Sequence, residues 1–287
     1  DMSGYLAKTM RPDGYGLLNN DGDQDNNRDF VLETANKYNR SDWEYIASNG
    51  KSGSKPSTGP SYLFPYAGQL ISRSGFDQDA QWSFFDIGPW GSGHQHNDKL
   101  HISVFAYGRD LLVDGGRFAY RGEVADKFRK YATGSASHNV ILVDGNGQAA
   151  GIPKAETPLA ENLYSISNDF NYGSGTFDKF SGVEGQVSHT RSMIYVRGKF
   201  WVVADHLETD RPRQIETLWH WHPRNLVRVE KSGITATAND RGNLAIIPVG
   251  AADWKISEVK GQEKPFIQGW YSKEYNTYEP NPTTIYS

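Results

Sequence analysis

The 287-residue sequence has no cysteine, little net charge and no long hydrophobic run. The missing cysteines exclude disulfides, a thiolate nucleophile and any cysteine-ligated zinc or iron–sulfur site. A formal net charge of −4 argues against broad binding to nucleic acid or to a membrane surface. No apolar run approaches the roughly 18 residues of a membrane-spanning helix. No signal-peptide pattern opens the chain, and we expect that a leader or a whole domain has been removed before Asp1.

Glycine and aromatic residues are plentiful instead, with 30 Gly, 16 Tyr and 8 Trp. Short runs rich in β-branched and aromatic residues alternate with turn signals such as Asp144-Gly145-Asn146-Gly147. Many strands with close turns and no alternating helices predict a mainly β chain folded as an antiparallel β-sandwich. The strongest strand candidates are 66–73, 81–87, 100–107, 111–113, 139–143, 191–196, 200–204, 215–220, 234–238 and 244–248.

One segment, 29–48, has the apolar spacing of a helix, with Phe30, Val31 and Ala35 among its periodic positions. A connector rich in Gly, Ser and Pro follows at 51–65. The sequence therefore predicts a short helical region at the N-terminus, a boundary near residue 60, and a β domain from there to the end.

Four of the eight histidines lie between residues 88 and 139. In an extended segment, His94, His96 and Asp98 would share one face, at the end of a core-facing strand. Two histidines and one aspartate make a chemically sensible zinc set, and Asp114 and His138 follow at the ends of later strands. Structural histidines held by hydrogen bonds are the alternative, and the spacing matches no compact zinc motif.

Several motifs in this region resemble the C-terminal β-sandwich of heparinase II/III-like polysaccharide lyases. The opening Arg11-Pro12-Asp13-Gly14, followed by the predicted helix, is similar to the end of the helical toroid that precedes that sandwich. The other matching segments are GHQHND at 93–98, LVDGG at 112–116 with Tyr120, HNV at 138–140, WVVAD at 201–205 and GWYS at 269–272.

The resemblance implies a supersandwich-like antiparallel β-sandwich facing an (α/α) toroid across a cleft. Residues 1–60 would be the end of the toroid and a linker, and 61–287 the sandwich, which we expect to be incomplete at its C-terminus. An acidic polysaccharide would be cleaved in the cleft by β-elimination at a uronic acid. The family's remaining catalytic residues come from the toroid, so we expect the isolated chain to have little or no lyase activity.

The resemblance also implies roles for individual residues. A catalytic tyrosine is placed between Asp114 and His138, and Tyr120 and Tyr131 both fit that place. The Gly-rich loop that carries Trp90 and the basic residues after Asp114 are candidates for sugar contacts, although a solvated turn would look the same. The predicted site residues are His94, Tyr120 and Tyr131 for catalysis, Trp90, Arg117 and Arg121 for substrate binding, and His96, Asp114 and His138 for a mainly structural zinc ion.

Two other functions stay open: a non-catalytic module that binds acidic glycans, and a metal-dependent hydrolase built on the same three ligands. The acidic segment 20–27 resembles a calcium loop, but Asn26 and Leu32 depart from that pattern, and calcium is not expected. The polymer is not identified, and heparan sulfate, alginate and hyaluronan all contain uronates. Because such polymers are met outside the cytoplasm, we expect a periplasmic or secreted protein.

Overall fold

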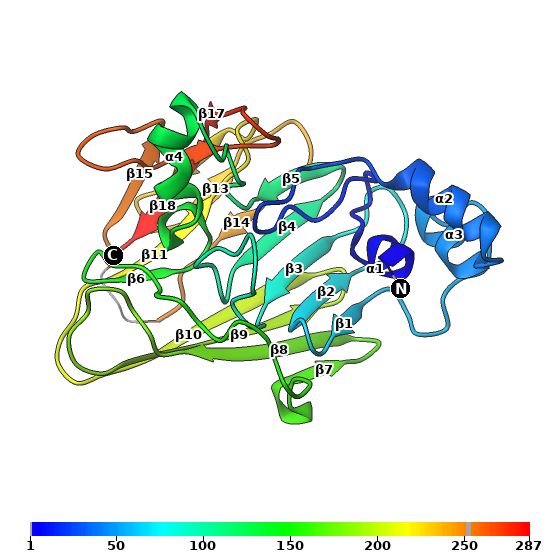
Figure 1. Cartoon of the computed structure of the whole chain (residues 1–287), viewed down its shortest axis with the longest axis horizontal. Helices are drawn as coiled ribbons and strands as arrows, with labels where there is room; N and C mark the ends of the chain where they lie inside the picture. Colours follow the sequence, from blue (N-terminus) through cyan, green and yellow to red (C-terminus); the bar gives the residue numbers. More distant parts are fainter. Residues whose placement is uncertain (1, 251–253) are drawn as a thin grey trace.

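The structure is a computed structural model that describes residues 2–250 and 254–287. Antiparallel sheets make up most of it, and three of its helices gather at one end, beside the N-terminus (Figure 1). The helices of the described residues are α1 (Met2–Thr9), α2 (Arg28–Lys37), α3 (Ser41–Ala47) and α4 (Glu123–Ala132), with the short 3-10 turns η1 (Ser135–Ser137) and η2 (Glu161–Leu163).

In the described residues, the strands form five antiparallel sheets. The first sheet has the order β1-β2-β3-β4-β5: β1 (Tyr62–Phe64), β2 (Gln69–Arg73), β3 (Trp82–Asp86), β4 (Ile102–Ala106) and β5 (Arg109–Leu112). The second has the order β10-β9-β8-β7: β7 (Tyr164–Ile166), β8 (Phe170–Phe177), β9 (Val187–Val196) and β10 (Phe200–Thr209).

The other three sheets come mainly from the C-terminal part of the chain. One has the order β15-β18-β11-β6: β6 (Ile141–Val143), β11 (Ile215–His220), β15 (Ile256–Lys260) and β18 (Pro282–Tyr286). The smaller two are β12-β13-β14 and β16-β17: β12 (Val227–Val229), β13 (Thr235–Thr237), β14 (Ala245–Ile246), β16 (Trp270–Tyr271) and β17 (Glu279–Pro280).

The first sheet is buried on both faces, because consecutive residues of its strands are apolar and point alternately to one face and the other. Leu70 and its cross-strand partner Phe85 belong to the main core, which they share with Met193 of the second sheet. The next pair, Ile71 and Phe84, belongs to a second core formed with helices α1 to α3. Successive residues of a strand point to opposite faces, so this one sheet packs against a sheet on one side and against helices on the other.

The predicted β-sandwich fold class is confirmed, and each of the ten predicted strand segments overlaps a strand of the structure. The single helix predicted at 29–48 is wrong, because the chain forms α2 and α3 with a break between them. Asn39, in the break, has a left-handed backbone with φ of 53°, which a continuing helix does not allow. No helix in the described ranges is both long and apolar enough to cross a membrane.

Strand β8 and helix α4 lie near the site and were not predicted from the sequence. Strand β8 contains Gly173 and Gly175, which looks unlike a strand in sequence. A Cβ at Gly173 would lie 2.9 Å from Leu70 Cδ2, and one at Gly175 would lie 2.8 Å from Ile87 Cγ2. The glycines therefore allow β8 to approach the first sheet closely.

Candidate active site

The segment between β3 and β4 carries His94 and His96, and it is irregular rather than extended. The predicted common face of these residues is therefore wrong. His94 has a left-handed backbone with φ of 59°, and its side chain is 69% exposed, whereas His96 is completely buried. The turn at His94 directs one histidine outward and leaves the other in the interior.

Asp21, from the loop before α2, joins these two histidines. Its Oδ2 lies 3.0 Å from His94 Nδ1, its Oδ1 lies 3.0 Å from His96 Nε2, and Arg129 of α4 donates to the same carboxylate at 2.9 Å. Burial alone would raise the pKa of this carboxyl, but the hydrogen bonds from His96 and Arg129 outweigh burial and hold the pKa well below its usual range. Asp21 is therefore a buried anion that orients both rings.

The segment of Asp21 is fixed to the histidine loop by further hydrogen bonds. The Asn20 side chain accepts from the backbone N–H of His96 at 2.8 Å, and the backbone N–H of Asp21 donates to the carbonyl of His94. Sequence reasoning did not place Asp21 in the site, because 73 residues separate it from His94. Its acidic neighbours suggested a solvated loop, and no local signal distinguishes Asp21 from Asp23 or Asp25.

The three predicted metal ligands lie together in the interior. His96, Asp114 and His138 each offer a ligand atom, and these atoms all lie within 4.8 Å of one another. His138 Nδ1 is 2.9 Å from Asp114 Oδ2, and its Nε2 is 3.1 Å from the carbonyl of Ala132. Burial opposes a charged imidazolium here, but Asp114 outweighs burial and raises the pKa of His138 to about 9.

Unpartnered polar atoms beside this cluster indicate that a cation fits it. His96 Nδ1 and Asp98 Oδ2 are buried and have no hydrogen-bond partner among the described residues. Such atoms are costly unless something satisfies them. His96 holds its other nitrogen against Asp21, which is how metal-binding histidines are commonly oriented. An ion between Asp114 and His138 would replace the hydrogen bond that now joins them.

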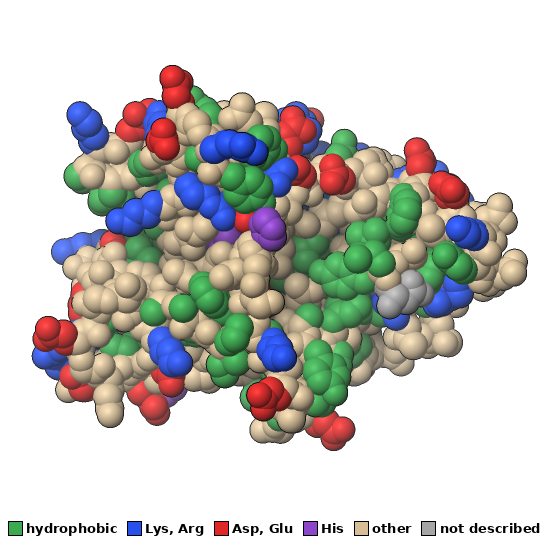
Figure 2. Space-filling model, in the orientation of Figure 1, with side chains coloured by type: hydrophobic (Ala, Val, Ile, Leu, Met, Phe, Trp, Pro, Cys, Tyr) green, Lys and Arg blue, Asp and Glu red, His purple; other side chains and the backbone are tan. Residues whose placement is uncertain are grey.

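Tyr120 stands beside the exposed histidine. Its hydroxyl is 2.9 Å from His94 Nδ1, and its side chain is 42% exposed. The guanidinium groups of Arg117 and Arg129 lie 5.4 and 5.1 Å from the centre of its ring. Lys and Arg side chains gather over α4 and the segments beside it on the face shown in Figure 2. This pair of polar side chains therefore lies at the surface in a positively charged setting.

Tyr131 occupies a different environment. It is buried on the apolar face of α4, and its hydroxyl donates to Gln268 Oε1 at 3.0 Å and contacts the Trp270 carbonyl at 3.3 Å. Burial raises the pKa of its phenol well above the usual range. In this arrangement Tyr131 supports the helix that carries Arg129, and its hydroxyl does not face the surface beside His94.

The predicted sugar-contact residues are more dispersed. The indole N–H of Trp90 donates to Asn97 Oδ1 at 2.9 Å, which ties the Gly-rich loop to the histidine loop. Arg117 pairs with Asp23, and this contact holds the acidic loop against the site. Arg121 is exposed and forms no ion pair within the described ranges.

The arrangement can move a proton at the protein surface. A carboxylate only accepts hydrogen bonds, so Asp21 holds His94 in the tautomer with the proton on Nδ1. The other ring nitrogen, Nε2, makes no hydrogen bond to any described residue and is available to a molecule bound at the surface. His94 can thus accept a proton at Nε2, while the Tyr120 hydroxyl lies 2.9 Å from its other nitrogen, Nδ1.

Comparisons with solved structures give the same fold. The heparan sulfate lyase HepC of Pedobacter heparinus superposes with a TM-score of 0.83 and 22% identity, and the match covers 99% of this chain and 43% of that one. A heparinase III structure superposes with a TM-score of 0.76 and 16% identity over 99% of this chain and 45% of that one. At these identities the likeness establishes the fold.

Two curated proteins are similar in sequence. A heparin-sulfate lyase of Pedobacter heparinus is 24% identical over 234 residues, which are 80% of this chain and 33% of that protein. A heparin-sulfate lyase of Bacteroides stercoris is 22% identical over 57% of this chain and 23% of that protein. The chain thus spans a third or less of the length of these relatives. The model of the heparinase II/III-like C-terminal family matches residues 56–287, and the chain belongs to that family.

Proposed function

We propose that this chain is the sandwich part of a polysaccharide lyase that cleaves a uronic-acid-containing glycosaminoglycan by β-elimination. The observation that carries the proposal is the surface pair of His94 and Tyr120, hydrogen bonded at 2.9 Å and oriented by buried Asp21. The similarity to two heparin-sulfate lyases supports heparan sulfate as the first polymer to test. A toroid with the remaining catalytic residues would complete the cleft, as the greater length of these relatives suggests.

In β-elimination, the C5 proton of the uronate is removed and the 4-O-linked chain leaves, which produces an unsaturated uronate. Negative charge develops on the uronate carboxylate during the reaction, so positive groups nearby stabilise the transition state. Arg117 and Arg129 would provide that charge. His94 Nε2 and the Tyr120 hydroxyl are the groups of this chain that can exchange protons with the sugar.

We also propose that the His96–Asp114–His138 cluster holds a zinc ion. Two histidines and a carboxylate are a suitable donor set for zinc once His138 has released its extra proton, and the unpartnered His96 Nδ1 supports this assignment. When bound, the ion would supply a fixed positive charge that holds the loop of His94 to the strands. The role of the ion is then structural, and no proton transfer depends on it.

We further propose that the protein acts outside the cytoplasm, in the periplasm or as a secreted protein. The support is chemical, because a large acidic polymer is encountered there.

The decisive experiment measures the ultraviolet absorbance of unsaturated uronate products, using the chain joined to its toroid and heparan sulfate as substrate. We expect His94→Ala to lower kcat by at least about 100-fold, because general acid–base groups contribute roughly that much, and Tyr120→Phe to lower it strongly too. The matched controls are His206→Ala and Tyr66→Phe, since both side chains are exposed.

Normal turnover in the His94→Ala enzyme would contradict the assigned role. Saturated products would instead establish the hydrolase alternative, because hydrolysis adds water and leaves no double bond. Binding of heparan sulfate without any product, in the complete protein, would establish the non-catalytic glycan-binding alternative.

A further inference from the structure

A cleft of about 570 Å³ is lined by residues other than the proposed catalytic pair. It is lined by the loop after α1, by the turn between β4 and β5, and by side chains that follow β11 and β16. None of its lining residues belongs to the site of His94, Tyr120 and Asp21. Its volume is in the range of small-ligand pockets.

Positive charge dominates this cleft. Three carboxylates line it, and all three are already paired: Asp13 and Asp110 with Arg11, and Asp79 with Arg241. The cationic lining residues are Arg11, Arg109, Arg224, Arg241 and Lys273. Five cations against three anions leave a local excess of positive charge, although the whole chain has a net charge of −4.

The excess positive charge is available to a ligand. Arg224 and Lys273 are exposed and form no ion pair with any residue that the structure describes. Among the residues that the structure describes, Arg109 forms an ion pair with Asp240 alone, and the Asp240 side chain is 86% exposed. Exposed ion pairs of that kind contribute little, so Arg109 can exchange its partner for a bound anion at small cost.

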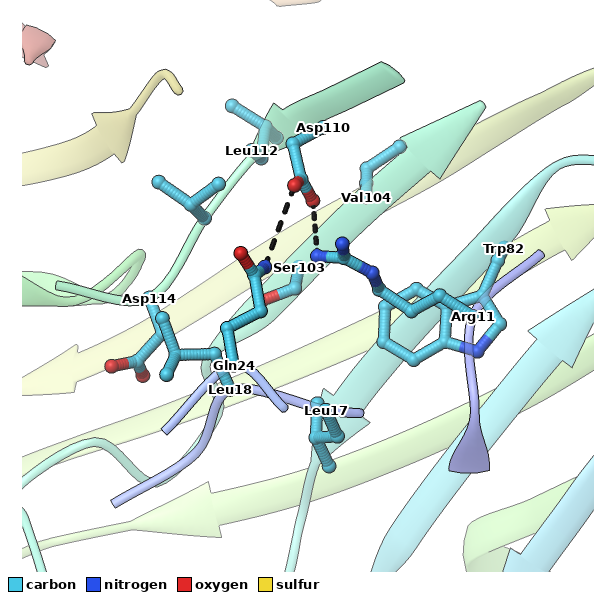
Figure 3. Close-up of a pocket in the computed structure, with 11 residues that line it drawn as sticks. Arg11, Leu17, Leu18, Gln24, Trp82, Ser103, Val104, Asp110, Leu112 and Asp114 are labelled. Carbon is cyan, nitrogen blue, oxygen red and sulfur yellow. Dashed lines mark hydrogen bonds and ion pairs between the residues drawn. The ribbon is translucent and has the colours of Figure 1, made fainter. Parts of the chain in front are cut away.

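The inner wall of the cleft is rigid. Arg11 is 5% exposed, and its guanidinium is held between Asp13 and Asp110. Figure 3 shows Arg11 and Gln24 directed toward Asp110, while the carboxylate of Asp114 points away from this group. Asp110 of β5 lines the cleft and Asp114, two residues after β5, belongs to the proposed metal cluster, so the two sites share this segment of the chain.

Aromatic rings complete the lining. Tyr107, at the turn between β4 and β5, is 46% exposed, and Tyr15 lines the cleft from the N-terminal loop. Tyrosine combines an apolar ring with a polar hydroxyl, and such rings pack well against the apolar faces of sugars. Cations, carboxamides and tyrosines together suit a ligand that is both anionic and rich in hydroxyl groups.

We propose that this cleft binds an acidic oligosaccharide, through its carboxylate or sulfate groups, at a site separate from the catalytic pair. Arg224 and Lys273 contact the anionic groups, and Tyr107 contacts a sugar ring. The choice of a saccharide rests on the proposed function, whereas the preference for an anion rests on the charges of the cleft. Such a site would hold part of a long polymer while another part is cleaved.

The test is isothermal titration of a heparan sulfate tetrasaccharide into the 287-residue chain, with thermal unfolding of every variant as a check of folding. We expect Arg224→Ala combined with Lys273→Ala to weaken binding at least about tenfold, because hydrogen bonds to charged groups are the strong ones. The matched control is Lys199→Ala combined with Lys231→Ala, which removes the same charge from exposed positions elsewhere. His94→Ala should leave this binding event in place.

The second arm uses the desulfated tetrasaccharide, which keeps its carboxylates. If it binds, the carboxylates are the recognised groups; if only the sulfated form binds, the sulfates are. Equal affinity in the two double variants, or no binding by the unchanged chain, would overturn the proposal. These outcomes are independent of the lyase assay, which measures unsaturated product. Binding without product would support the cleft and not the lyase function, and product without binding at the cleft would do the opposite.

Discussion

Asp21 is the residue on which the geometry of the candidate site depends most. Its side chain is 2% exposed, and one carboxylate contacts the exposed His94, the buried His96 and Arg129 of α4. We predict that Asp21→Asn lowers kcat of the proposed lyase, assayed with its toroid, by roughly 100-fold with a smaller change in KM. The amide can donate to His94 Nδ1 and stabilise the wrong tautomer, an effect known to be large when a histidine loses its orienting carboxylate.

The matched control is Asp25→Asn, because Asp25 lies in the same loop and is exposed. A purely structural role for Asp21 would lower the melting temperature and the amount of active enzyme without changing kcat per folded molecule. Equal kcat values for Asp21→Asn and Asp25→Asn would therefore contradict the positioning role.

The proposed metal site can be tested without an activity assay. Zinc added to the metal-free chain should raise its melting temperature, because a ligand that binds only the folded state at 100 times its Kd adds about 2.7 kcal/mol. His96→Ala and His138→Ala should abolish the zinc-dependent increase. His206→Ala is the control, since that side chain is 73% exposed. An unchanged melting temperature with zinc in the unmodified chain would refute the metal site.

At the residue scale, the sequence pointed to the histidines and Asp114 as candidate site residues, but it did not point to Asp21, which orients two of the histidines. His94, His96, Asp114 and His138 stand in recognisable motifs; the structure clusters the last three, and Asp21 links His94 to His96. The role of Asp21 is purely tertiary, since its loop meets the histidines only after folding. The different environments of the two tyrosines are also tertiary, since Tyr131 lies on the buried face of α4 and Tyr120 is exposed.

At the scale of elements, strands β9 and β10 contain a buried ion pair that contacts the segments next to the proposed metal ligands. Arg191 is fully buried, and its Nε and Nη2 donate to Asp205 at 2.7 and 3.0 Å. Arg191 also donates to the carbonyls of Leu100 and Asn139, next to the proposed ligands' loops. We predict that Asp205→Asn lowers the free energy of unfolding by about 3–5 kcal/mol, because it leaves a buried cation uncompensated.

Urea unfolding checks this value, with Glu208→Gln as the control on the same strand, where the side chain is 76% exposed. The pH dependence gives a second readout. Burial alone would raise the pKa of Asp205, but Arg191 and His189 hold it well below the unfolded value. Its stabilisation is therefore fully present above about pH 4 and is lost as the pH falls below that. Asp205→Asn should lack this acid-dependent loss.

Helix α4 shows why some elements could not be predicted. Phe128, Tyr131 and Ala132 have helical spacing, but basic residues between them favoured a solvated turn as the interpretation. Strand β8 was missed because its glycines look like turn residues, although close packing against the first sheet requires them. By contrast, β11 (Ile215–His220) coincides with its predicted range, since its apolar residues are continuous and its ends are clear.

At the scale of the whole molecule, the N-terminal helices and the first sheet share a core. Trp43 of α3 is 1% exposed and belongs to the same apolar cluster as Ile71 of β2 and Phe105 of β4. Residues beyond α3 then cross an exposed connector, and a Cβ at Gly59 would meet no atom within 4 Å. The connector is therefore a suitable place to cut the chain without disturbing the core.

We predict that a chain cut at a protease site inserted beside Gly59 keeps its two parts together. On gel filtration both pieces should elute in one peak at the volume of the uncut chain, because separation would expose the apolar core between helices and sheet. Trp43→Ala should promote dissociation, since such a truncation commonly costs about 3–5 kcal/mol, whereas Phe30→Ala should not, because Phe30 is 47% exposed. Separation of the two pieces of the otherwise unmodified chain would contradict this prediction. Because Asp21 lies on one piece and His94 on the other, separation would also break the candidate site.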